Sequence, residues 1–211
     1  MDNIEDLISS LSKDVAALKP APHPILLSLK WLGVAVAYLA VSLAISGVRS
    51  DLLMQFHKPL FNAEIIVLLG IFISTALSAA VLAFPDLYQK RALAFAPLWI
   101  FALFVVVILS AWFADEPPAP LPMHSFECTM SILLFSLLPT IGIFYAMRKF
   151  ASTHQHASGS IAVLFAFSIG ALYLRLHELN DSVIHVIEWH YLPMIAVGAL
   201  GLWLGKLLLK W

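Results

Sequence analysis

The chain has 211 residues, of which 61% are hydrophobic and 12% are charged, and its formal net charge is -1. A soluble domain carries about 25% charged residues, so this composition excludes an ordinary soluble protein and indicates a polytopic membrane protein. The sequence has no basic stripe, which argues against direct binding of DNA or RNA. The single cysteine, Cys128, excludes an intramolecular disulfide and a zinc finger.

The first segment, residues 3–18, is predicted to be an amphipathic helix. Apolar residues recur there at intervals of three and four, which places them on one helix face: Ile4, Leu7, Ile8, Leu11, Val15 and Leu18. Proline at positions 20, 22 and 24 ends the helix in a stiff joint. Acidic residues predominate, whereas helices that lie on membranes are rich in Lys and Arg. We therefore interpret the segment as a helix that inserts into a hydrophobic groove of a cytoplasmic partner. The alternative is that it lies on the bilayer or packs on the bundle.

Six apolar runs follow, each long enough to cross a hydrocarbon core of about 30 Å. They fall at 25–47, 63–84, 92–113, 127–147, 160–176 and 189–209. The sequence therefore predicts an all-α integral membrane bundle of six transmembrane helices (residues 25–211), preceded by the short cytoplasmic amphipathic helix and its joint (residues 1–24). Prolines 97, 139 and 193 lie inside these runs and are tolerable, because neighbouring helices can satisfy the backbone groups that they leave free.

The distribution of Lys and Arg predicts the orientation. If the N-terminus is cytoplasmic, nine basic residues lie inside: Lys13, Lys19, Lys30, Lys90, Arg91, Arg148, Lys149, Lys206 and Lys210. Only Arg49, Lys58 and Arg175 then lie outside. Basic residues favour the cytoplasmic side, so both termini are expected in the cytoplasm.

Several short motifs and single residues occur in a characteristic order along these elements. They are Asp6-Leu7-Ile8, Leu11 and Asp14; then Cys128, Ile132, Pro139 and Arg148; then Gly159, Gly170 and Tyr173; then His177-Glu178-Leu179-Asn180-Asp181-Ser182; and finally Trp189, Tyr191, Gly198, Gly205 and Lys210-Trp211. With six spans, this order resembles the NrsF family, bacterial inner-membrane anti-sigma factors for extracytoplasmic-function (ECF) sigma factors. The resemblance covers nearly the whole chain.

The resemblance implies a regulatory role rather than an enzymatic one. The N-terminal helix would hold a sigma factor away from RNA polymerase, and a periplasmic stimulus to the membrane sensor domain would release it. The residues implied in sigma contact are Ile4, Leu7, Ile8, Leu11 and Val15, with Asp6 and Asp14 at the rim. The family commonly has a second outer cysteine, which would fall about where Glu178 stands here. This departure puts redox sensing by a cysteine pair in doubt.

The outer regions also predict a transition-metal site, for zinc or copper, because imidazole, thiolate and carboxylate are their usual ligands. The candidate ligands are His124, Glu127, Cys128, His177, Glu178, Asp181 and His185, with His190 near them. If residues 177–188 are helical, positions 177, 181, 185 and 188 line one stripe. Two other interpretations stay open: solvated polar residues at helix ends, or protonation of His177 and His185 between about pH 5 and 8. We expect Arg175 to form a structural ion pair and Glu64 to be a helix-dipole partner.

Other classes of function are weighed against this interpretation. A small six-span transporter or channel would need polar groups in mid-span or broken helices in matching halves. A membrane enzyme would need a cluster of catalytic groups, and the outer His, Glu and Asp residues match no hydrolase motif. Gly201 and Gly205 are expected to pack inside the bundle rather than between chains. The sequence does not indicate the oligomeric state.

Overall fold

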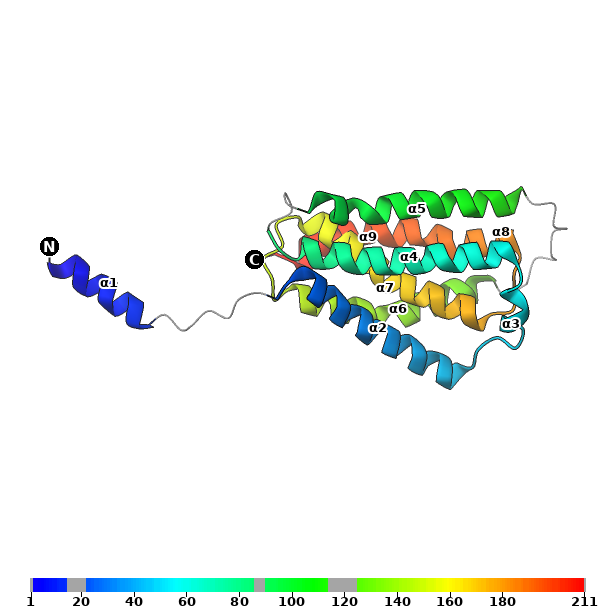
Figure 1. Cartoon of the computed structure of the whole chain (residues 1–211), viewed down its shortest axis with the longest axis horizontal. Helices are drawn as coiled ribbons and strands as arrows, with labels where there is room; N and C mark the ends of the chain where they lie inside the picture. The colour runs from blue at the N-terminus through cyan, green and yellow to red at the C-terminus, as the bar shows by residue number, and fades with distance from the viewer. Residues whose placement is uncertain (1, 15–21, 86–89, 114–124, 211) are drawn as a thin grey trace.

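A computed structural model describes residues 2–14, 22–85, 90–113 and 125–210 (Figure 1). Throughout these ranges the regular secondary structure is helical. The longer helices are α1 (Asp2–Asp14), α2 (Pro24–Ser46), α4 (Pro59–Leu82), α5 (Arg91–Trp112), α6 (Ser125–Met147), α7 (Gln155–His177) and α9 (Leu192–Leu208). The short elements are α3 (Leu52–Gln55), α8 (Val183–His185) and a π-helical turn, η2 (Val186–Tyr191), which continues directly into α9.

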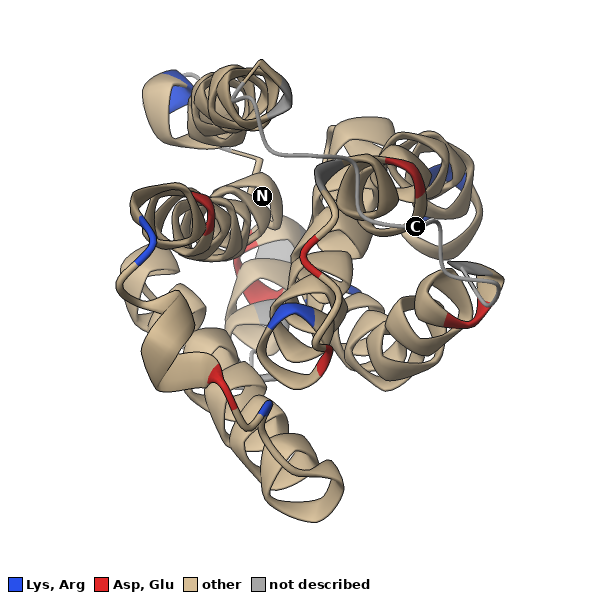
Figure 2. Ribbon diagram, turned by 90° about the vertical axis from the view of Figure 1, so that its right-hand side faces the viewer, with Lys and Arg blue, Asp and Glu red and all other residues tan. Residues whose placement is uncertain are grey.

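The prediction of six membrane spans is confirmed. Six helical segments are long and apolar enough to cross a membrane, and the last of them, Val186–Leu208, joins η2 to α9. Because the spans alternate in direction, α2 begins and α9 ends at the same end of the bundle (Figure 1). We call the opposite end, which carries α3 and α8, the α3 end. Figure 2 looks onto this end.

Helices α4 and α7 form the interior of the bundle. Helix α7 packs against α4, α6 and α9, and α5 covers the other side of α4. Buried apolar side chains such as Leu68 and Ile71 of α4 and Phe167 and Leu172 of α7 build one continuous core. The two central helices therefore carry the side chains that tie the bundle together.

Helices α7 and α9 approach each other through glycine. A Cβ atom added at Gly159 of α7 would overlap the backbone of Gly201 and Gly205 in α9. The hydroxyl of Ser160 donates to the carbonyl of Gly198 at 2.9 Å across the same interface. The expectation that Gly201 and Gly205 pack within the chain is confirmed, because this contact uses the small residues that allow close helix approach.

Two prolines inside spans are compensated by neighbouring helices. Proline has no N–H, so the carbonyl four residues before it loses its helical partner. The hydroxyl of Tyr38 donates to the carbonyl of Phe135, four residues before Pro139, at 3.1 Å. The hydroxyl of Thr129 donates to the carbonyl of Trp189, four residues before Pro193, at 2.6 Å. The second bond fixes η2 against α6.

Candidate functional site

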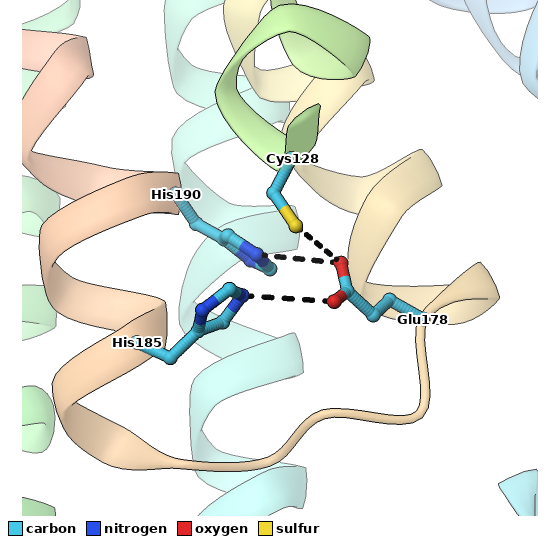
Figure 3. A group of neighbouring side chains, drawn as sticks. All are labelled: Cys128, Glu178, His185 and His190. Atoms are coloured by element: carbon cyan, nitrogen blue, oxygen red, sulfur yellow. Dashed lines mark hydrogen bonds and ion pairs between the residues drawn. The ribbon is translucent and has the colours of Figure 1, made fainter. Parts of the chain in front are cut away.

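Four potential ligand side chains meet near the α3 end (Figure 3). Cys128 lies in the first turn of α6, Glu178 directly follows α7, His185 ends α8, and His190 lies in η2. One ligand atom from each residue can be chosen so that all four lie within 4.8 Å of one another. We call these four residues the Cys-Glu-His cluster.

Glu178 is the centre of this cluster. The Cys128 thiol donates to Oε2 of Glu178 at 3.0 Å. Nε2 of His185 lies 3.6 Å from Oε1, and Nε2 of His190 lies 3.7 Å from Oε2. Both imidazole contacts are longer than a normal hydrogen bond. One carboxylate therefore faces a thiol and two imidazoles, which come from three other elements.

The π-helical turn brings the two histidines together. In an α-helix, residues five apart point in directions that differ by about 140°, because each residue turns by about 100°. A π turn closes hydrogen bonds between residues five apart and so places them on the same face. His185 and His190 have this spacing, and their ring centroids are 5.0 Å apart. Pro193 and the Thr129–Trp189 bond favour this turn, because the α-helical partner of the Trp189 carbonyl is missing.

Both imidazoles are buried without hydrogen bonds. Each histidine is 1% exposed, and none of their four ring nitrogens has a hydrogen-bond partner in the described part of the chain. Burial lowers the pKa of His185, and the nearby Arg175 lowers it further. The charge of Glu178 acts to raise this pKa but does not outweigh the burial. This favours the neutral imidazole, the form that binds metals. The cluster offers one sulfur, one carboxylate and two imidazoles, a donor set suited to a transition metal.

The structure assembles only part of the predicted metal site. It unites Cys128, Glu178 and His185, and it adds His190 as the fourth member of the cluster. The predicted helical stripe is wrong, because α7 ends at His177 and residues 178–182 are not helical.

The remaining predicted ligands lie elsewhere. Nδ1 of His177 contacts the carbonyl of Gly47 at 2.8 Å, and Asp181 pairs with arginines. Glu127 is exposed and is not a member of the cluster, and His124 lies outside the described residues.

A second polar group at the α3 end is a buried ion-pair network. Arg175 donates two hydrogen bonds to Glu64, both at 2.9 Å, and a third to Asp181 at 2.6 Å. Tyr191 also donates to Glu64, and Arg49 donates to Asp181. The predicted ion pair of Arg175 is confirmed with Asp181 and extends to Glu64. The dipole interpretation of Glu64 is wrong, because this carboxylate is buried against Arg175 and Tyr191.

Acid should weaken the contribution of Asp181 to stability. Burial acts to raise the pKa of Asp181, but hydrogen bonds from Arg49 and the charge of Arg175 outweigh it, so the pKa falls below its ordinary value of 3.8. The stabilisation is therefore complete above the unfolded pKa and is lost as the pH falls through the folded pKa. We expect Asp181→Asn to cost about 1–3 kcal/mol near neutral pH and progressively less below about pH 4.

Thermal unfolding of the detergent-solubilised protein across this pH range checks the prediction. Asp6→Asn on α1 is the control, and it should leave the unfolding of the bundle unchanged at every pH. If the difference in unfolding temperature between wild type and Asp181→Asn instead increased as the pH fell, the predicted direction of the pH dependence would be contradicted.

Helix α1 is the other candidate functional surface. In Figure 1 it lies apart from the bundle. Its side chains Ile4, Leu7 and Ile8 are 57–64% exposed, and Asp6 is exposed beside them. The structure gives α1 as 2–14 rather than the predicted 3–18; Val15 lies outside the described residues, and the side chains of Leu11 and Asp14 are not described. An apolar stripe on a separate helix is therefore available to a partner.

The six-span bundle and the separate amphipathic helix define an integral membrane protein whose short extramembrane parts are suited to binding. A family model described as "Negative regulator of sigma F" matches residues 11–211. The chain thus belongs to the NrsF family, a regulatory and non-enzymatic family of sigma-factor regulators. It is 28% identical over 215 aligned positions to the anti-sigma-F factor NrsF of Caulobacter vibrioides (strain NA1000 / CB15N). This alignment covers 98% of the present chain and 99% of the Caulobacter protein. No solved structure matches the chain.

Proposed function

We propose that this protein is an anti-sigma factor of the bacterial inner membrane that sequesters an ECF sigma factor through α1 and releases it on a periplasmic signal. Its family supports the regulatory role. The observation that carries the proposal is the exposed apolar stripe of α1, held apart from a bundle that is itself built for the membrane.

The chemistry of α1 favours a protein groove over a lipid surface. Full burial of a Leu or Ile side chain stabilises a complex by about 1.5–3 kcal/mol, so the three exposed side chains offer a substantial binding energy. The same helix carries Asp2, Glu5 and Asp6, which anionic lipid would repel. A helix of 13 residues is only marginally stable in water, so a groove that binds it would also complete its folding.

The arrangement of the bundle supports opposite locations for the two sites. Helix α1 precedes the end where α2 begins and α9 ends, and the Cys-Glu-His cluster lies near the opposite end (Figure 1). Nine of the twelve Lys and Arg residues belong to the side of α1 in the predicted orientation. By the preference of basic residues for the cytoplasm, α1 would face the sigma factor and the cluster would face the periplasm.

The periplasmic signal would act at the cluster, as metal or redox stress. With one cysteine in the chain, an internal disulfide cannot carry it. Cys128 instead contacts Glu178, which stands about where the family resemblance places a second cysteine. This pairing favours metal over thiol–disulfide exchange as the input.

A charge on the apolar stripe of α1 should abolish sigma binding. Leu7→Asp removes an exposed apolar side chain and would place a carboxylate in the groove, so we expect at least a 100-fold loss of affinity. The measurement is capture of the purified ECF sigma factor of the same genome by the full chain in detergent, with affinity determined by titration. Ser9→Asp is the matched control, because residue 9 lies on the opposite face of α1.

Three outcomes are decisive. Binding by wild type and Ser9→Asp but not by Leu7→Asp supports the proposal. Equal binding by all three proteins would show that α1 is not the contact surface. Absence of binding by wild type would overturn the sequestration model for this sigma factor.

A further inference from the structure

We infer that Cys128, Glu178, His185 and His190 form a four-ligand site for a divalent transition-metal ion of the zinc class. The inference deepens the proposed function, in which a metal signal acts at this cluster, but it does not depend on sigma binding by α1. It rests on four features of the cluster: its distances, its charge, its buried imidazoles and its preformed scaffold.

The spacing of the ligand atoms is close to that of a tetrahedral site. Zn–S bonds of about 2.3 Å and Zn–N or Zn–O bonds of about 2.0–2.1 Å place tetrahedral ligands roughly 3.3–3.6 Å apart. Oε2 of Glu178 lies 3.0 Å from the sulfur of Cys128 and 3.7 Å from Nε2 of His190, and Oε1 lies 3.6 Å from Nε2 of His185. The widest pair in the cluster is within 4.8 Å. The widest spacing exceeds the tetrahedral one by at most about 1.5 Å, so side-chain movement within the cluster would complete the coordination sphere.

The charge of the ligand set matches a divalent ion. A Cys128 thiolate and the Glu178 carboxylate supply two negative charges, and two neutral imidazoles add none. A divalent cation would make the site neutral, which is favourable at the edge of a membrane bundle. One thiolate and two imidazoles do not suit Mg²⁺ or Ca²⁺, which prefer oxygen, and the carboxylate disfavours Cu⁺, which prefers softer ligands.

The buried imidazoles need a partner that the cluster does not supply. His185 and His190 are each 1% exposed, and their ring nitrogens lack hydrogen bonds among the described residues. An unsatisfied buried polar group costs about 1–3 kcal/mol. Both Nε2 atoms face Glu178 (Figure 3), so a metal beside this carboxylate would satisfy one nitrogen of each ring.

A shared proton fits the same geometry less well. It would require a charged imidazole at 1% exposure. A proton would also engage only one imidazole at a time, which would leave the other without a partner.

The scaffold holds the ligands in place before any ion arrives. The π-helical turn sets His185 and His190 on one face, and the Thr129–Trp189 bond ties this turn to α6 beside Cys128. The side chain of Glu178 is 23% exposed, which gives an ion a path from water. Binding would replace the Cys128 S–H bond by an S–metal bond, with the thiol proton and the waters of the ion released to solvent.

The test uses the full chain, purified in detergent, stripped with EDTA and kept reduced. We expect Co²⁺ to bind once per chain with the intense visible bands of a tetrahedral complex and a near-ultraviolet thiolate-to-cobalt band, and Zn²⁺ to displace it. Because Cys128 is the only cysteine, wild type alone assigns the sulfur ligand. Absence of saturable binding, or a cobalt complex without the thiolate band, would overturn the site even if a variant failed to fold.

The variants identify the other ligands. His190→Gln should lower the affinity for Zn²⁺ by about 100-fold or more, since even losing an outer-sphere partner costs about 10–100-fold. His177→Gln is the matched control, because His177 contacts Gly47 instead of the cluster, and it should bind like wild type. Equal affinity of wild type and His190→Gln, or an equal loss in His177→Gln, would overturn the ligand set. The experiment contains no sigma factor, so its result does not depend on whether α1 binds one.

Discussion

Replacement of Arg175 by methionine should lower the free energy of unfolding of the bundle by about 3–5 kcal/mol, the usual cost of breaking a buried ion pair from one side. The guanidinium of Arg175 joins Glu64 through two parallel hydrogen bonds, and it lies 4.8 Å from the ring of Phe61. Without it, the Tyr191 hydroxyl is the one hydrogen-bond donor left to the buried carboxylate of Glu64 among the residues that the structure describes. Asp181 is less affected, because it still pairs with Arg49.

The double variant Glu64→Leu/Arg175→Met separates a stranded charge from a simple loss of packing. Removing both partners leaves no unpaired carboxylate, so most of the lost stability should return. Chemical unfolding in mixed micelles measures these differences. Lys58→Met is the control at the same end of the bundle, because Lys58 is exposed, and it should change little. A double variant as unstable as Arg175→Met would contradict the explanation.

The second large effect is expected where α7 meets α9. Gly159→Ala should destabilise the bundle by about 1–3 kcal/mol or more, in the range of overpacked cores. The added Cβ would overlap the backbone of Gly201 and Gly205, which cannot turn aside as a flexible side chain can. The helices would have to separate, and the Ser160–Gly198 hydrogen bond would weaken with them.

Gly142→Ala is the matched control for this substitution. Gly142 also lies inside a membrane helix, but a Cβ atom there would meet nothing within 4 Å. Alanine is the better helix former by about 0.5–1 kcal/mol, so this variant should be neutral or slightly more stable. For both variants, the measurement is the temperature at which half of the monodisperse protein is lost on heating. The same sign for the two variants would show that helix propensity, rather than close approach, decides the outcome.

Hydrophobic patterning was sufficient to predict the six spans. Runs of about 20 apolar residues have few alternatives to a membrane helix, because every backbone group must be satisfied internally there. Their order along the chain also predicts that α2 begins and α9 ends at one end of the bundle. The amphipathic α1 follows from the period of its apolar residues, a local signal that needs no tertiary contact.

The candidate metal site shows where a linear pattern stops being informative. Residue types alone pointed to Cys128, Glu178 and His185, but α-helical spacing wrongly joined His177 and Asp181 to them. His190 was missed as a ligand because a spacing of five does not share a face in an α-helix. The useful signal was Pro193, which leaves the Trp189 carbonyl without its α-helical donor and so favours the π turn.

The sequence by itself therefore determined the elements whose stability is local: the six spans, their alternation and the apolar stripe of α1. Only the tertiary structure decided which polar side chains meet. Glu64 and Arg175 are separated by 111 positions, and Cys128 and Glu178 by 50. Such pairs depend on how the helices pack and where each helix ends, and a shift of one residue along a helix turns a side chain by about 100°. Hydropathy is insensitive to that shift, whereas a binding site is not.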